Sequence, residues 1–189
     1  HTHTHTHTHT HTPPPNPPHT VYDAYITTRV LLTRAALSTP WGSSRVWQAN
    51  EIVPGLFLGN LVDCLDRPGL QKAGVTHVVS AIRGMPPVGA PLLHTVVPVL
   101  DVPQEELLPH LRDCVEFLVA SLPPDGDARV LVHCMQGVSR SATIVAAYLI
   151  HSRGMSPADA IAYVQAKRPV VNPNPGFREQ LEAFAALKE

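Results

Sequence analysis

Charged residues, aromatic residues and long apolar stretches are all scarce in this 189-residue sequence. Charged residues make up 15% of it, and 14 Lys and Arg nearly balance 15 Asp and Glu. A basic surface that attracts nucleic acid or anionic lipid is therefore not expected. The longest largely apolar stretch, from Ala142 to Ile150, has about half of the ~20 residues that a membrane-spanning helix needs. We therefore expect no nucleic-acid partner and no membrane span.

Cysteine is scarce as well. Cys64, Cys114 and Cys134 are an odd number and contain no Cys-x-x-Cys pair. A disulfide scaffold and a structural zinc site are therefore not expected, no metal or other cofactor is predicted, and the cytoplasm or the nucleus is the expected location. The sequence starts at His1 and its first methionine is Met85. We expect it to be a piece of a longer chain, so targeting segments cannot be judged from it.

The beginning of the chain differs in composition from the rest. Residues 1–20 are His-Thr repeats and a proline cluster without charged or aliphatic side chains. Such a stretch cannot bury enough apolar surface to offset the entropy of ordering, so a disordered arm is predicted, with a metal-binding His tract as the alternative. Residues 21–45 are predicted to contain a helix from Val21 to Leu37 and a linker from Thr39 to Ser44. The folded domain is expected over residues 46–189.

Predicted strands and helices alternate within that domain. Strands are predicted over 52–58, 75–82, 93–99 and 129–132, and helices over 63–73, 105–122, 140–152, 156–168 and around 177–184. The helix that begins at Arg140 is apolar nearly all round, which is typical of a buried central helix. The pattern predicts an α/β fold with a central, mostly parallel sheet flanked by helices.

The residues best suited to chemistry lie between the strand that ends at Val132 and the helix that begins at Arg140. The sequence there is His133-Cys134-Met135-Gln136-Gly137-Val138-Ser139-Arg140-Ser141. Loops from a strand to a helix N-terminus bind anions in α/β sheets, and five residues between Cys134 and Arg140 can wrap their N–H groups around a tetrahedral oxyanion. These N–H dipoles and the Arg140 guanidinium favour a thiolate, so the pKa of Cys134 is expected well below the ordinary ~8.5.

This nine-residue sequence resembles the His-Cys-x-x-Gly-x-Ser-Arg-Ser signature of the dual-specificity protein phosphatases, a family of the cysteine-dependent tyrosine phosphatase superfamily. The resemblance extends from Val46 to about Leu187 and includes Arg168-Pro169 and the segment Asn174 to Phe177. It implies a small, atypical member with a tyrosine-phosphatase-like fold. In that fold the phosphate-binding loop, here residues 133–140, lies between a core strand and a buried helix.

The resemblance also implies catalytic roles. Cys134 would attack phosphorus, Arg140 would bind the phosphoryl oxygens, and the Ser141 hydroxyl would help to expel the thiolate from the phosphocysteine. Asp101, about thirty residues before the nucleophile as in the family, would be the general acid. Asn174 would brace the loop, with turn formation beside Pro173 and Pro175 as an equal alternative.

The other residues of the loop and the nearby acidic residues and histidines are expected to have supporting or structural roles. The rest of the phosphate-binding loop would be formed by His133, Met135, Gln136, Gly137, Val138 and Ser139. His133 would orient the loop and add positive character beside Cys134. Three acidic residues (Glu105, Glu106 and Asp113) are interpreted as charges on the solvated face of a helix. Three isolated histidines (His77, His94 and His110) are interpreted as surface or structural residues.

The expected function is hydrolysis of phosphotyrosine and of phosphoserine or phosphothreonine in proteins. Val102 and Pro103 follow the expected acid where a large aromatic lid would deepen the pocket, so a shallow, dual-specificity pocket is predicted. Two alternatives are a phosphatase for lipid, glucan or RNA esters and a non-catalytic phosphoprotein-binding module. The uncharged loop residues Met135, Gln136 and Val138 favour a phosphorylated protein, with a kinase among the candidate partners.

Overall fold

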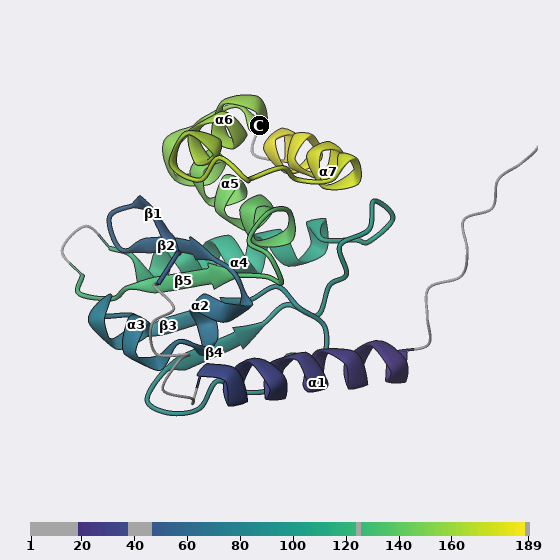
Figure 1. The fold of residues 1–189 in the computed structure, drawn as a ribbon. Coiled ribbons are helices and arrows are strands. Elements are labelled where there is room, and N and C mark those ends of the chain that lie inside the picture. Colours follow the sequence, from purple (N-terminus) through teal and green to yellow (C-terminus); the bar gives the residue numbers. More distant parts are fainter. Residues whose placement is uncertain (1–18, 38–46, 124–125, 188–189) are drawn as a thin grey trace, which may run out of the picture.

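The computed structural model describes residues 19–37, 47–123 and 126–187 (Figure 1). The predicted arm lies outside the described residues except for its last two positions, which belong to helix α1, His19–Leu37. The predicted linker from Thr39 to Ser44 also lies outside them. The proposed division into arm, helix with linker, and catalytic domain stays a prediction.

A five-stranded sheet forms the centre of the fold. Its strands are β1 (Asn50–Val53), β2 (Leu56–Gly59), β3 (His77–Ser80), β4 (Leu93–Val96) and β5 (Val130–His133), in the order β1-β2-β5-β3-β4. Strands β2, β5, β3 and β4 are parallel, and β1 is antiparallel to β2. Every residue of β2 and β5 is buried, as parallel strands covered on both faces should be. The predicted α/β class is confirmed.

Two predicted elements are each divided into two. The strand expected over 52–58 is the hairpin β1–β2, because Pro54 and Gly55 reverse the chain and Gly55 takes a φ of +78°, a conformation open to glycine. The helix expected over 63–73 is α2 (Leu61–Leu65) followed by α3 (Arg67–Lys72). Asp66 ends α2 and caps α3, with Pro68 in the first turn of α3. Apolar residues flank the first break on both sides, and the second break lies two residues before Pro68-Gly69, where the sequence allows an irregular helix.

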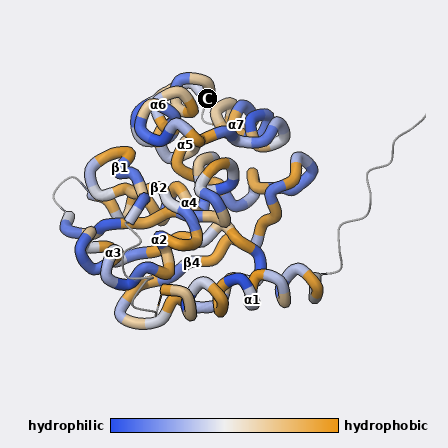
Figure 2. Tube along the Cα trace, viewed as in Figure 1, coloured by the Kyte–Doolittle hydropathy of each residue, from blue (hydrophilic) through white to orange (hydrophobic). Residues whose placement is uncertain are grey.

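Helices cover both faces of the sheet (Figure 1). One side carries the helices α4 (Leu108–Ser121), α5 (Arg140–Arg153), α6 (Pro157–Lys167) and α7 (Pro175–Ala186), and the other carries α1, α2 and α3. Helix α5 is buried on nearly all sides, as predicted, and it packs against β5, α4, α6 and α7. Hydrophobic residues gather in the central strands and α5, whereas the outer helices alternate between hydrophobic and hydrophilic positions (Figure 2).

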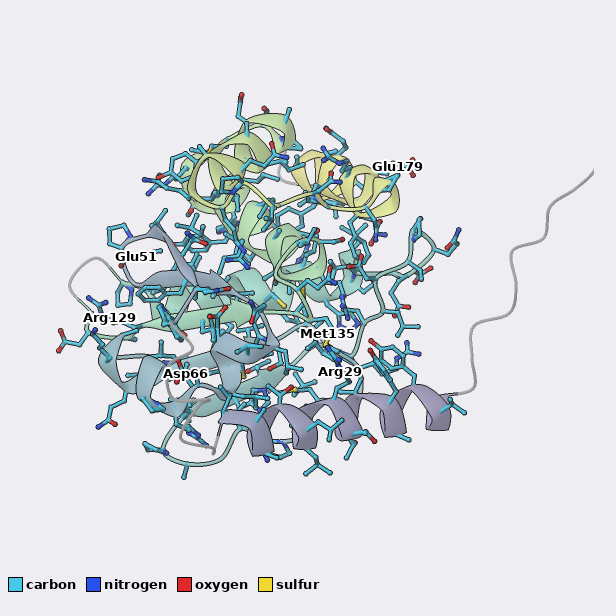
Figure 3. The ribbon with its side chains drawn as sticks, viewed as in Figure 1. Arg29, Glu51, Asp66, Arg129, Met135 and Glu179 are labelled. Carbon is cyan, nitrogen blue, oxygen red and sulfur yellow. The ribbon has the colours of Figure 1, made fainter. Side chains whose placement is uncertain are left out.

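Helix α1 packs against the rest of the protein rather than standing apart from it. Ile26 and Val30 are 0% and 1% exposed, and the helix contacts α2. Charged side chains such as Glu51, Arg129 and Glu179 project outward from the fold (Figure 3). None of the described helices is long and apolar enough to cross a membrane.

Candidate active site

The loop between β5 and α5 crosses the carboxyl edge of the sheet, with β2 and β3 on either side of β5. Cys134 follows the strand directly and is 1% exposed. Gly137 has a φ of +69°, and a Cβ on it would overlap the backbone of Gly59. This turn therefore needs glycine both for its conformation and for its close approach to β2.

The carbonyl groups of this loop are bonded away from its centre. Those of residues 135–138 accept, in order, from Leu61 N (3.3 Å), Arg168 Nη2 (3.2 Å), Arg168 Nε (3.0 Å) and Asn172 N (2.8 Å). Because a trans peptide holds its N–H opposite its C=O, the N–H groups that follow these carbonyls point into the loop. The result is a ring of inward donors that suits an oxyanion.

Arg168, which orients two of these carbonyls, was not among the predicted site residues. Its side chain is buried and also donates to Gln48 O (3.0 Å) and Asn50 Oδ1 (2.8 Å). The guanidinium thereby joins the loop to the segment that enters β1. The only sequence signal for it is the Arg168-Pro169 match to the family.

Hydrogen-bond donors surround the Cys134 sulfur. Gly137 N–H is 3.3 Å and the Ser141 hydroxyl is 3.2 Å from Sγ. Burial alone would raise the pKa of Cys134, but the charge of Arg140 and the hydrogen bonds from Ser141 and Val138 outweigh it and leave this pKa below its ordinary value. A thiolate held in this way is a ready nucleophile.

Arg140 begins α5, and its side chain is buried beside the loop. Its Nη1 donates to Val99 O at 3.3 Å. Its Nε is buried and finds no hydrogen-bond partner among the described residues, since Asp101 Oδ2 lies 3.7 Å away. A buried guanidinium with a free N–H at this position can bind phosphoryl oxygens.

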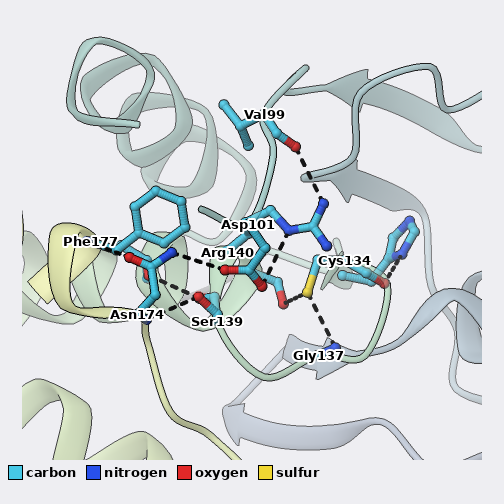
Figure 4. A network of polar contacts seen from close by, with 11 residues as sticks. Val99, Asp101, Cys134, Gly137, Ser139, Arg140, Asn174 and Phe177 are labelled. Atoms are coloured by element: carbon cyan, nitrogen blue, oxygen red, sulfur yellow. Dashed lines mark hydrogen bonds and ion pairs between the residues drawn. The ribbon is translucent and has the colours of Figure 1, made fainter. Parts of the chain in front are cut away.

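Asp101 lies on the loop that follows β4, and its side chain is 34% exposed. Asn174 Nδ2 donates to Asp101 Oδ1 at 3.0 Å, which leaves Oδ2 on the side of Arg140 (Figure 4). Asn174 also caps α7 through Phe177 N–H (3.0 Å), and its own N–H donates to Ser139 Oγ (3.1 Å). Asn174 therefore contacts both the loop and the Asp101 carboxylate while it caps α7, so the geometry allows both of its expected roles.

Glu105 differs from its predicted position. Helix α4 begins at Leu108, so Glu105 lies in a loop and not on a solvated helix face. It is largely buried and forms an ion pair with Arg83 at 3.1 Å. Glu106, also before the helix, and Asp113, on it, are exposed as expected.

The positive character predicted for His133 is wrong. Its ring is fully buried, and this burial lowers its pKa to about 3, so it is neutral. Its Nε2 lies 2.6 Å from Ser80 Oγ, and its Nδ1 lies 3.2 Å from the Cys134 carbonyl oxygen. His94, predicted to be isolated, lies 2.7 Å from the same Ser80 hydroxyl. No sequence signal links these three residues before the strand register is known.

Cys64 and Cys114 are unlike Cys134. Both are buried free thiols, and burial raises the pKa of each to about 12. They are therefore protonated and unreactive at neutral pH. Within the ranges that the structure covers, no three His, Cys, Asp or Glu side chains form a group that could hold a metal ion.

Known proteins are similar to this chain from strand β2 to helix α7. The family model of the dual specificity phosphatase catalytic domain matches residues 56–186. Human dual specificity protein phosphatase 15 is 38% identical over 133 residues, which is 70% of this chain and 44% of that protein. For dual specificity protein phosphatase 22 of Xenopus tropicalis, the identity is 37% over 136 residues, 71% of this chain and 64% of that one.

A solved structure agrees with this similarity. The crystal structure of human tyrosine phosphatase-like serine/threonine/tyrosine-interacting protein has a TM-score of 0.70 and 36% identity, covering 76% of this chain and 99% of that chain. The curated relatives are longer, and this chain spans about half the length of the first of them.

Proposed function

The chain belongs to the dual specificity phosphatase family, and we propose that it hydrolyses phosphate esters of tyrosine and of serine or threonine in proteins, through a phosphocysteine intermediate. The observation that carries this proposal is the position of Cys134. Its sulfur lies within a loop whose carbonyls point outward, beside the buried guanidinium of Arg140 and the carboxyl group of Asp101.

In the first step, the Cys134 thiolate attacks phosphorus, and the P–S bond forms as the bond to the substrate oxygen breaks. The leaving oxygen takes the proton of Asp101, whose Oδ2 lies on the side of Arg140 because Asn174 holds Oδ1. Arg140 and the inward N–H groups bind the three phosphoryl oxygens that do not react. They stabilise the charge of the transition state at no cost of reorganisation.

In the second step, water attacks the phosphocysteine and gives its proton to Asp101, which is now a carboxylate. The P–S bond breaks, phosphate leaves and the thiolate is restored. The Ser141 hydroxyl, 3.2 Å from Sγ, donates to the sulfur as its negative charge returns. The cycle begins and ends with Cys134 ionised and Asp101 protonated.

The chemistry of the loop surface supports a phosphoprotein substrate. Met135, Gln136 and Val138 carry no charge, so the loop offers nothing to match the extra phosphates of a polyphosphorylated headgroup. Val102 and Pro103 beside Asp101 leave the cleft without a large aromatic wall. We place a phosphorylated kinase among the candidate substrates, and three free thiols suit action in the cytoplasm or the nucleus.

The test is hydrolysis of p-nitrophenyl phosphate by the wild type, Cys134→Ser and Cys114→Ser. We expect vanadate-sensitive turnover in the wild type and in Cys114→Ser, and none in Cys134→Ser, which should still bind inorganic phosphate. Turnover that survives in Cys134→Ser would refute the scheme. Vanadate binding without turnover in the wild type would favour a phosphoprotein-binding module.

Substrate range is tested with peptides of one sequence that carry phosphotyrosine, phosphothreonine or phosphoserine. A shallow cleft should release phosphate from all three. Release from phosphotyrosine alone would show that the cleft is deeper than the sequence of the acid loop suggests.

A further inference from the structure

A chain of hydrogen bonds runs under the phosphate-binding loop through residues that the reaction does not use. It joins Val88 N to His94 Nδ1 (3.3 Å), His94 Nε2 to Ser80 Oγ (2.7 Å), Ser80 Oγ to His133 Nε2 (2.6 Å) and His133 Nδ1 to Cys134 O (3.2 Å). The sheet brings these residues together, because β3 lies between β4 and β5 and Ser80 pairs with His133. The chain ends on the carbonyl group of the nucleophile.

The two ends of this chain fix the place of every proton in it. The Val88 N–H can only donate, so His94 Nδ1 is unprotonated and the neutral ring carries its proton on Nε2, where it is donated to Ser80. The Cys134 carbonyl can only accept, so His133 carries its proton on Nδ1. Its Nε2 then accepts the hydroxyl proton of Ser80, which receives from one histidine and donates to the other.

The surroundings of the chain support this arrangement. Ser80 and His133 are 0% exposed, and burial lowers the pKa of both histidines, so both rings are neutral. Burial keeps the Cys64 thiol protonated, so no negative charge lies beside this chain on that side. The hydroxyl oxygen of Ser80 can therefore accept from His94 while its own proton is donated to His133.

We propose that His94 is a positioning residue for the reaction assigned above, acting through Ser80 to select the tautomer of His133 that holds the Cys134 carbonyl outward. A carbonyl held outward keeps the next N–H, that of Met135, among the inward donors. The other tautomer would set the lone pair of His133 Nδ1 against the carbonyl oxygen and turn this peptide away. The effect of His94 on catalysis rests on the proposed function. The tautomer of His133 rests on the hydrogen-bond chain alone.

The kinetic test compares His94→Leu, Ser80→Ala and the double variant. Each single change should lower kcat/KM for p-nitrophenyl phosphate about tenfold, the effect of losing one oriented hydrogen bond. The double variant should be no slower than the worse single variant, because both changes break the same chain. His94→Gln, which keeps an N–H near Ser80, should recover most of the rate. The matched control is His77→Leu on β3, which should stay at the wild-type rate.

The second readout does not need turnover. Long-range ¹H–¹⁵N spectra report the tautomer of each imidazole, and the His133 signals are assigned by their loss in His133→Gln. We expect His133 to be a single Nδ1–H tautomer in the wild type and a mixture in His94→Leu and Ser80→Ala. Ser80→Ala removes one oxygen atom, so it serves even where His94→Leu does not fold.

The outcomes separate the two proposals. An unchanged His133 tautomer in Ser80→Ala, or rate losses that add in the double variant, would overturn the role of His94. A tautomer that shifts as expected in a protein without turnover would leave the hydrogen-bond chain standing and refute the proposed function.

Discussion

Replacement of Arg168 by Met tests whether the outward carbonyls make the oxyanion site. The substitution removes the donor from the carbonyl groups of Gln136 and Gly137, now bonded at 3.2 and 3.0 Å, and keeps an unbranched side chain of similar length. Each buried carbonyl left without a partner costs about 1–3 kcal/mol, so the pair costs about 2–6 kcal/mol if the loop keeps its shape.

That cost is large enough to change the loop. Rotation of the two peptides relieves it, because the carbonyls can then turn toward the cleft, and each rotation removes one inward N–H. The loss of one oxyanion donor typically slows an enzyme by about 10²–10³. We therefore expect Arg168→Met to lower kcat by at least about a hundredfold and to weaken vanadate inhibition, while the fold survives.

The assay measures kcat, KM and the vanadate inhibition constant, with urea unfolding as the measure of stability. Arg153→Met is the matched control, since Arg153 lies at the end of α5 and stacks over Tyr163, and it should keep the wild-type rate. If Arg168→Met stays folded and retains both its kcat and its vanadate affinity within about threefold, the outward carbonyls are not what forms the site.

Three further predictions concern the reacting groups and the turn between them. Asp101→Asn should lower kcat/KM by about a hundredfold and abolish the decline of rate at high pH, because no acid remains to lose its proton; a decline that persists would assign the acid elsewhere. Because the pKa of Cys134 is lowered, the rate of its alkylation by iodoacetamide should begin to increase at a lower pH than the rate for an ordinary thiol. Arg140→Met should move this rise to higher pH, and an unmoved curve would contradict the role of the guanidinium. Gly137→Ala should destabilise the fold by about 1–3 kcal/mol in urea titrations, because its φ of +69° suits glycine, and wild-type stability would show that the loop tolerates a side chain there.

The loop between β5 and α5 could be predicted because its nine residues are consecutive and match the family signature. Asp101 could be placed through the family's spacing, although its contact with Asn174 spans 73 positions. The strand expected over 52–58 runs through the turn at Pro54-Gly55, because apolar residues continue on both sides of it.

Sequence patterns could not identify the residues that hold the loop in place. Arg168 follows the last turn of α6, where a basic residue usually interacts only with the helix dipole, and its partners lie 31 and more positions away. Ser80, His94 and His133 meet only because three strands pair in one register. Long-range supports of this kind depend on which strands are neighbours, and a single sequence does not state that.

The cap of α7 connects the last described helix to the proposed general acid. Asn174 ties the first turn of α7 to Asp101 and Ser139, whereas the middle of the loop is held by Arg168 and Leu61. Local opening of that first turn would free the acid and leave most oxyanion donors in place. Exchange of the Phe177 amide with solvent would report the same opening. With the turn closed, the molecule would act as an enzyme, and with the turn open it would only bind phosphate. The free energy of opening of the first turn of α7 would set the populations of these two states.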